Sequence, residues 1–327
     1  MDAMDVFINY VTVWTMLGVC CVGVITNSIN ISVFFKQGFH EGATISMTFL
    51  SFWSLFKCIC GIGYRLGGPV GLVSPALGLT WKNITLPYVE FTGMYAGYVS
   101  FALAAFISIE RCLCVSKPFT AKKIITPKVT LTVLLSISVV ASGAYIVVYF
   151  MYDIQFEYSQ IFNTSVAKYI HSNFYDAKSD IVMSYYQVMA ILIPTSGFFI
   201  LTISSTITVH YLRKSTQFLK HKTDHKLNNP VCVISNREKQ VVKTLLAVIL
   251  VYIINLFPRL IFYIAQLWEP EFQLLRKYNK LFVLVAASIS VFDFSNASIH
   301  FFIYYNMSSG FRNNFFKACT VVSYPRS

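Results

Sequence analysis

The segment SIERCLCVSKPF, Ser108 to Phe119, sets an acid and a base side by side at the end of a long apolar run. That run extends from about Leu86 to Val115, so it can cross the roughly 30 Å hydrocarbon core of a bilayer as one helix. A guanidinium at the edge of such a core needs a carboxylate partner, because an unpaired buried charge is strongly destabilising. We therefore expect Glu110 to hold Arg111 where a membrane helix ends.

The composition indicates that the rest of the chain is also embedded in lipid. Of its 327 residues, 56% are hydrophobic and only 12% are charged. Soluble proteins carry about 25% charged residues, so this chain could not cover a water-exposed surface of its own. The net charge of +12 does not indicate a nucleic-acid partner, because Lys and Arg gather in loops between apolar segments and the sequence has no nucleic-acid motif.

Seven apolar segments are long enough to span a bilayer as helices. They lack the alternation of barrel strands, so we predict an all-α membrane protein, a seven-transmembrane helix bundle that forms a single domain. The predicted spans are Val11 to Phe35, Ala43 to Leu66, Leu86 to Val115, Val129 to Tyr152, Ile181 to Leu212, Val241 to Leu267 and Lys280 to Tyr305.

The distribution of positive charge predicts which way the bundle faces. The segments from Lys117 to Lys128 and from Arg213 to Lys243 are far more basic than the loops at the other side. Because basic loops stay in the cytoplasm, residues 1–10 should be extracellular and the carboxyl terminus cytoplasmic, in a plasma-membrane protein. The sequons at Asn83 and Asn163 then lie outside and are candidate glycosylation sites.

With these spans in place, the sequence resembles the rhodopsin-like class of G-protein-coupled receptors. The segment that contains Glu110 and Arg111, and the proline that follows it, are similar to the D/E-R-Y motif and second inner loop of that class. Further matches follow in order along the chain: Asn27 in the first span, Pro194 in the fifth, Pro258 in the sixth, and Tyr304 ahead of the segment Phe311 to Phe315. The resemblance implies that residues 308–327 form a short amphipathic eighth helix and a cytoplasmic tail.

The resemblance also implies a mechanism and its partners. In this class Arg111 would be held by Glu110 and by an acid at the base of the sixth helix, where Glu238 stands 20 residues before Pro258. Breaking that lock would let the sixth helix swing outward and open a groove, a two-state switch that a ligand biases. The implied partners are a heterotrimeric G protein, arrestin, a receptor kinase, the lipid bilayer and a small-molecule or peptide ligand.

The sequence also departs from the class at several positions. Ser54 stands where the second helix of the class has Asp, so the usual sodium site is not expected. The residues His300 to Tyr304 replace the N-P-x-x-Y motif without its proline. No Cys lies between Asp153 and Asp180, so the disulfide that joins this loop to the third helix of the class is not expected either.

This set of departures is similar to the chemosensory receptor families of molluscs. We therefore expect a chemosensory receptor for a small polar ligand, with an invertebrate neuropeptide receptor of the same class as the alternative. Cys319, just past the predicted eighth helix, is a candidate for palmitoylation.

Five ionisable side chains inside the spans are the candidate ligand-binding residues, because a charge within the bilayer is costly and usually functional. They are Lys57, Arg65, Glu90, Arg259 and Asp293. Two interpretations stay open. The five residues pair internally and hold helices together, or they line a polar cavity for a small zwitterion or anion, with Arg259 binding its carboxylate. Asp293, Asn296, His300 and Tyr304 also fall on one polar stripe of the seventh span.

Two other classes of function compete with a receptor. A transporter or channel would be expected to show an inverted repeat, broken helix pairs or a ring of charges, which the sequence lacks. A membrane enzyme would need a motif such as HExxH or G-x-S-x-G, and the sequence has neither. We therefore predict no enzyme, no catalytic residue, no cofactor and no metal, since the spacing of His221, Asp224 and His225 alone does not make a metal site.

Overall fold

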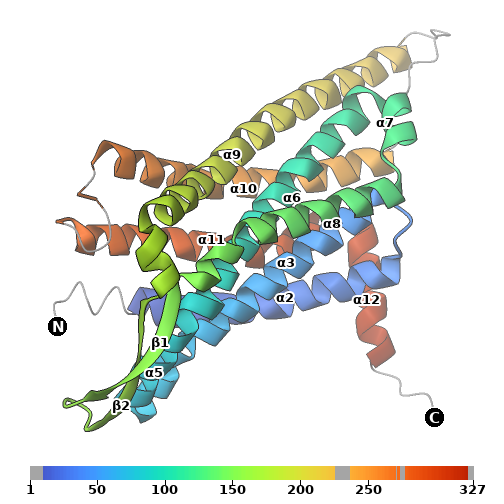
Figure 1. Cartoon of the computed structure of the whole chain (residues 1–327). Coiled ribbons are helices and arrows are strands. Elements are labelled where there is room, and N and C mark those ends of the chain that lie inside the picture. The colour runs from blue at the N-terminus through green and yellow to red at the C-terminus, as the bar shows by residue number, and fades with distance from the viewer. Residues whose placement is uncertain (1–9, 225–235, 270, 273–276, 323–327) are drawn as a thin grey trace.

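The computed structural model of the chain describes residues 10–224, 236–269, 271–272 and 277–322. Among them, seven helices are long and apolar enough to cross a membrane, which confirms the predicted seven-helix architecture. Figure 1 shows these helices packed lengthwise against one another in one bundle.

In chain order the seven long helices are α2 (Met16–Gln37), α3 (Gly42–Arg65), α6 (Phe91–Ser116), α8 (Pro127–Ala144), α9 (Asn173–Asp224), α10 (Asn236–Trp268) and α11 (Asn279–Met307). The shorter elements are the π-helical turns η1 (Tyr10–Thr15) and η2 (Leu86–Glu90), the 3-10 helix η3 (Ile146–Phe150), the helices α4 (Gly67–Val73), α5 (Pro75–Thr85), α7 (Pro118–Ile124) and α12 (Ser309–Val322), and the strands β1 (Tyr152–Ser159) and β2 (Thr164–His171). The two strands, α4 and α5 lie at one end of the bundle, called here the hairpin end, and α7 and α12 lie at the other, the Arg111 end (Figure 1).

The outward faces of the long helices are apolar. Val139 and Val140 of α8, Ile181 of α9 and Ile254 of α10 all expose more than 65% of their surface. Apolar surface repeated along several helices of a monomer marks contact with lipid or a partner. Inside the bundle, Leu103, Leu134, Leu256 and other side chains that are fully buried form a continuous core.

Local sequence explains where several of these helices begin. The hydroxyl of Thr126 accepts a hydrogen bond from the backbone N–H of Val129 at 3.3 Å, and Pro127 takes the first helical position of α8. Ser74 and Pro75 start α5 in the same way. The side-chain cap accepts a hydrogen bond from a backbone N–H that has no partner within the helix. Proline suits the first helical position because it has no backbone N–H that would need a partner there.

The fourth span ends earlier than predicted. We expected a helix to Tyr152, but α8 ends at Ala144 and the chain continues as the 3-10 helix η3. Gly143 and the β-branched residues Ile146, Val147 and Val148 account for the change, because both kinds of residue favour the α-helix less than Leu or Ala does. Tyr152 is the first residue of β1 instead.

The fifth span is longer than predicted. The helix α9 begins at Asn173 rather than Ile181 and reaches Asp224 rather than Leu212, with one non-helical residue, Lys178, near its start. The hydroxyl of Ser172 accepts from the N–H of Tyr175 at 3.2 Å and caps this helix.

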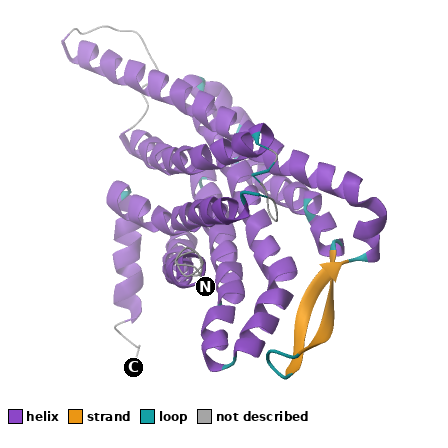
Figure 2. Cartoon of the chain, turned by 90° about the vertical axis from the view of Figure 1, so that its left-hand side faces the viewer, coloured by secondary structure: helices purple, strands orange, loops and turns teal. Residues whose placement is uncertain are grey.

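The segment predicted as the second outer loop contains an antiparallel hairpin. Tyr152 pairs with His171 and Ser159 pairs with Thr164, and Asn163 makes the turn with a left-handed φ of 52°. Asn tolerates this conformation better than most residues. Figure 2 shows the two strands projecting beside the helices, on the far side of the molecule from the carboxyl terminus.

The hairpin is fastened to α5 by hydrogen bonds. The side-chain amide of Asn83 donates to the carbonyl of Ala167 at 2.8 Å, and the hydroxyl of Thr80 accepts from the N–H of Ala167 at 3.3 Å. At its base, burial, followed by the nearby Tyr175 and Tyr169 hydroxyls, raises the pKa of Tyr152 above its ordinary value.

Residues 309–322 of the predicted eighth helix form α12, which runs across the direction of the long helices (Figure 1). The hydroxyl of Ser308 accepts from the N–H of Phe311 at 3.2 Å at its start. The ring of Phe311 then packs against Phe34 at 5.4 Å and Tyr304 at 5.7 Å between ring centroids. These contacts fix α12 against α2 and α11.

Candidate functional site

Arg259 and Asp293 form an ion pair between α10 and α11 in the interior of the bundle. Their side chains are 14% and 5% exposed. Arg259 directly follows Pro258, whose ring breaks the hydrogen-bond ladder of α10 and kinks such helices. In this structure Arg259 and Asp293 thus pair with each other.

Aromatic rings enclose the Arg259 guanidinium. Its central carbon lies 5.5 Å from the ring centroid of Tyr98 and 5.6 Å from that of Phe101, both on α6. Such cation–π contacts stabilise a desolvated guanidinium. The hydroxyls of Tyr98 and Tyr263 are hydrogen-bonded at 3.1 Å, which joins α6 to α10 one turn closer to the hairpin end.

Lys57 lies beside this pair but has a different environment. Its ammonium nitrogen donates to the backbone carbonyl of Asp293 at 3.2 Å and lies 4.8 Å from the ring centroid of Phe294. The residue is only 6% exposed. Within the described part of the chain, no carboxylate forms an ion pair with it.

A small cavity adjoins Lys57. Its lining includes the side chains of Ser54, Ser100, Tyr252 and Asn296, which come from four different helices. Ser54, which stands where the second helix of the class has Asp, lines this cavity and is 1% exposed.

Arg65 and Glu90 form the second ion pair of the hairpin half. The two guanidinium nitrogens lie 2.9 Å and 3.0 Å from the two carboxylate oxygens of Glu90, a bidentate geometry. The guanidinium also lies 4.9 Å from the ring centroid of Phe294. Bidentate pairing is the strongest form of charge-assisted hydrogen bonding, so it fixes α3 against η2.

Glu110 and Arg111 form an ion pair at the other end of α6, as the sequence led us to expect. The Arg111 guanidinium donates to one carboxylate oxygen of Glu110 at 2.6 Å. Ser46 of α3 donates to the other oxygen at 3.1 Å. Glu110 is 1% exposed and Arg111 is 8% exposed. The sequence did not indicate Ser46, because this contact spans 64 residues.

The second acid predicted for the Arg111 lock was Glu238, whose side chain lies outside the described residues. Two residues later, Gln240 joins α10 to the end of α11. Its amide nitrogen donates to the carbonyl of Met307 at 2.9 Å, and its oxygen accepts from the hydroxyl of Ser309 at 3.3 Å. The sequence alone gave no signal for this contact.

Asn27 ties α2 to α11. Its amide nitrogen donates to the carbonyl of Ala297 at 2.7 Å and to that of Gly23 at 2.8 Å. The hydroxyl of Ser298 donates to the carbonyl of Val19 at 3.1 Å, which adds a second link between the same helices. These bonds provide partners for the buried amide nitrogen of Asn27 and hold α2 against α11.

The predicted polar stripe of the seventh span faces the interior. Asp293, Asn296, His300 and Tyr304 are all at most 6% exposed. His300 packs against Tyr252 of α10, with 5.4 Å between ring centroids, and Tyr304 packs against Phe34 of α2 at 5.2 Å. The stripe therefore runs from the charged cluster toward the Arg111 end.

The remaining predicted sites are spread over the surface and loops. Asn83 is half-buried by its bond to Ala167, whereas Asn163 is exposed at the hairpin turn. Pro194 lies within α9. The side chain of Cys319 lies outside the described residues, as do those of His221, Asp224 and His225, for which no metal site was predicted.

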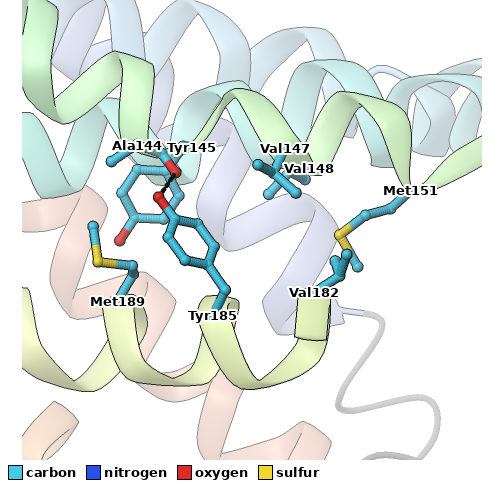
Figure 3. Close-up of a pocket in the computed structure, with 8 residues that line it drawn as sticks. All are labelled: Ala144, Tyr145, Val147, Val148, Met151, Val182, Tyr185 and Met189. Atoms are coloured by element: carbon cyan, nitrogen blue, oxygen red, sulfur yellow. Dashed lines mark hydrogen bonds between the residues drawn. The ribbon is translucent and has the colours of Figure 1, made fainter. Parts of the chain in front are cut away.

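Figure 3 shows a small apolar pocket between η3 and α9, lined by residues such as Val148, Met151 and Val182. The hydroxyl of Tyr185 donates across it to the carbonyl of Ala144 at 2.8 Å. Tyr145 also lines it and stacks on Tyr98 with 4.8 Å between ring centroids.

One protein-family model matches the chain, that of the "7 transmembrane receptor (rhodopsin family)", over residues 69–293. The matched residues include Arg111, Pro258 and Asp293, whereas Lys57 and Tyr304 lie outside them. No curated protein matches the chain.

Proposed function

The chain belongs to the rhodopsin family of seven-transmembrane receptors, and on that premise we propose that it is a chemosensory receptor that couples a small polar ligand to a heterotrimeric G protein. The observation that carries this proposal is the ion pair of Glu110 and Arg111 where α6 ends. Because Arg111 is nearly buried there, it becomes available to a partner only if its surroundings move.

The proposed switch is an outward motion of α10 at the Arg111 end. In the resting state Gln240 holds α10 against the junction of α11 and α12, and Glu238 would add a second restraint through Arg111. Pro258 supplies the kink about which the helix can pivot. A ligand that favours the open arrangement shifts the balance between the two states by its difference in affinity.

The proposed orientation follows the positive charge. Lys122 and Lys123 on α7, with Arg213 and Lys214 on α9, lie toward the Arg111 end. The positive-inside rule then assigns this end to the cytoplasm of a plasma-membrane protein and the hairpin end to the exterior. G protein, arrestin and receptor kinase would bind at the cytoplasmic end, where α12 and a lipid on Cys319 would lie along the membrane surface.

The proposed ligand site is the charged cluster of Lys57, Arg65, Glu90, Arg259 and Asp293. Its support is chemical: buried ion pairs are weak sources of stability, so their presence in membrane helices favours a functional role. A small zwitterion that competed with Asp293 for Arg259 would act directly on the joint between α10 and α11.

A peptide ligand is the second candidate, because the hairpin offers a surface for one. Phe156, Tyr158 and Ile161 expose 65%, 64% and 89% of their surface. An open crevice of about 700 Å³ lies at the base of the hairpin, lined by Phe150, Asp153 and other residues of η3, β1 and α9. A peptide would be anchored there rather than at Arg259.

The test is a screen followed by one substitution. Cells that express the receptor and a promiscuous G protein are exposed to water-borne amino acids and peptides, and the active compound is then used with purified G protein to measure nucleotide exchange. Arg111→Ala should abolish stimulated exchange while surface expression persists. The matched control is Lys122→Ala, an exposed cation of the same end, which should respond normally.

The proposal would be overturned by a purified receptor that binds an active compound but never stimulates exchange. Ligand-dependent ion flux in the same vesicles would instead indicate a channel.

A further inference from the structure

We propose that the cavity beside Lys57 binds one small monovalent anion, with chloride as the probe, between α3, α6, α10 and α11. The proposal does not depend on G-protein coupling, because it concerns the charge balance and stability of the bundle itself.

The first argument is charge balance. The interior of the hairpin half holds three cations and two carboxylates among the described residues. Glu90 pairs with Arg65 and Asp293 pairs with Arg259, so both carboxylates are already engaged. Lys57 is left with one uncompensated positive charge at 6% exposure. A buried unpaired charge is strongly destabilising, and a bound anion removes that penalty.

The second argument is the chemistry of the lining. The ammonium of Lys57 has three N–H donors, of which one is directed at the carbonyl of Asp293. Hydroxyls of Ser54 and Tyr252 line the same cavity and can donate to an anion, whereas the hydroxyl of Ser100 donates to the carbonyl of Ala96 at 2.9 Å. The carboxylate in the lining, that of Asp293, is already neutralised by Arg259.

The third argument is size. The cavity measures about 10 Å³, close to the space that one water-sized sphere requires. Gly97 borders it, and a Cβ at this position would lie 3.4 Å from the Lys57 nitrogen. The glycine therefore leaves the ammonium accessible on that side. A single halide suits such a space after small side-chain shifts, whereas sulfate and gluconate are too large.

The experiment measures the thermal unfolding midpoint of the purified receptor in detergent, with sodium chloride replaced stepwise by sodium gluconate at constant ionic strength. We expect the midpoint to rise with chloride and to saturate, with bromide acting like chloride and sulfate having no effect. Lys57→Met should show no chloride dependence, and in gluconate it should unfold at or above the temperature of the unsubstituted receptor. Lys82→Met removes an exposed lysine and should keep the full chloride dependence.

An unsubstituted receptor with equal midpoints in chloride and gluconate would overturn the proposal, and so would chloride dependence that survives in Lys57→Met. If Lys57→Met does not fold, Gly97→Ala takes its place, because the added methyl group narrows the cavity and should weaken the chloride effect. A receptor that binds chloride but does not couple to a G protein would refute the proposed function and leave this inference intact.

Discussion

The side-chain amide of Gln240 in α10 donates to the carbonyl of Met307, the last residue of α11, at 2.9 Å. Together with the bond from Ser309, this contact holds the Arg111 end of α10 against its neighbours. Each such bond contributes about 1 kcal/mol, so losing both should shift a two-state equilibrium by up to about 30-fold. Gln240→Ala should therefore raise nucleotide exchange in the absence of ligand by several-fold.

Lys243→Ala is the control for that measurement, because Lys243 is exposed on the same helix. Basal exchange that is equal in Gln240→Ala and Lys243→Ala would show that the contact does not restrain the switch.

The charged cluster predicts an asymmetry between its two partners. Asp293→Leu removes the carboxylate that pairs with Arg259 and leaves Lys57 beside a second buried cation, whereas Arg259→Met leaves Asp293 next to Lys57. Removing one partner of a buried ion pair typically costs about 3–5 kcal/mol, because the other charge is left buried and unpaired. In Arg259→Met the charge left behind is that of Asp293, and the nearby Lys57 ammonium reduces this cost. We expect Asp293→Leu to lower the unfolding midpoint and the surface expression more than Arg259→Met does.

Arg259→Met should at the same time lose the response to the active compound. The opposite order of stabilities would contradict the arrangement of these three charges. A normal ligand response in a well-expressed Arg259→Met receptor would exclude Arg259 as a ligand-binding residue.

The two predicted glycosylation sites should behave differently. The nitrogen of Asn83 that would carry a glycan is the atom that donates to Ala167, so a glycan there conflicts with docking of the hairpin. Asn163 stands exposed at the turn. Asn163→Gln should abolish the mobility shift that glycosidase produces on a gel, and Asn83→Gln should leave it unchanged. A glycosidase shift that persists in Asn163→Gln and disappears in Asn83→Gln would refute this assignment.

The amide of Asn27 should contribute to stability rather than to signalling. Asn27→Ala removes two buried hydrogen bonds, including the link from α2 to the carbonyl of Ala297, and should lower the free energy of unfolding by about 1–3 kcal/mol. Ser32→Ala, which removes an exposed bond within α2, is the control and should change little. Thermal unfolding of the two variants in detergent provides the comparison.

The sequence predicted those features that depend on residues close together in the chain. Hydropathy gave the seven long helices, since a span is a property of consecutive residues. The pairing of Glu110 with Arg111 followed from adjacency and from the apolar run before it. The polar stripe from Asp293 to Tyr304 followed from helical periodicity.

Contacts between distant residues could not be predicted in the same way. Nothing in the sequence near Ser46 or Gln240 indicates which helix they will meet, because that depends on how the helices cross and rotate. For the same reason the five charged candidates were identified individually, but the sequence did not tell us that Lys57 would be the residue without a carboxylate.

The hairpin was predictable and was missed. From Asp153 to Tyr158 polar and apolar residues alternate, which is the pattern of a strand with one face packed. We predicted the end of a helix and then a loop, because the apolar run of α8 continues into this segment without a break in composition. Alternation, rather than mean hydropathy, was the signal that distinguished them.

No Cys lies in the segments that form the β-hairpin and α5 at the hairpin end, since the sequence has none from residue 61 to 111 or from 115 to 231. The hydrogen bonds of Asn83 and Thr80 to Ala167 can therefore break and re-form reversibly, and no disulfide has to form or rearrange while the hairpin docks on α5. Cell-free synthesis under reducing conditions should consequently yield a native hairpin end, and recovery after denaturation should need no oxidant.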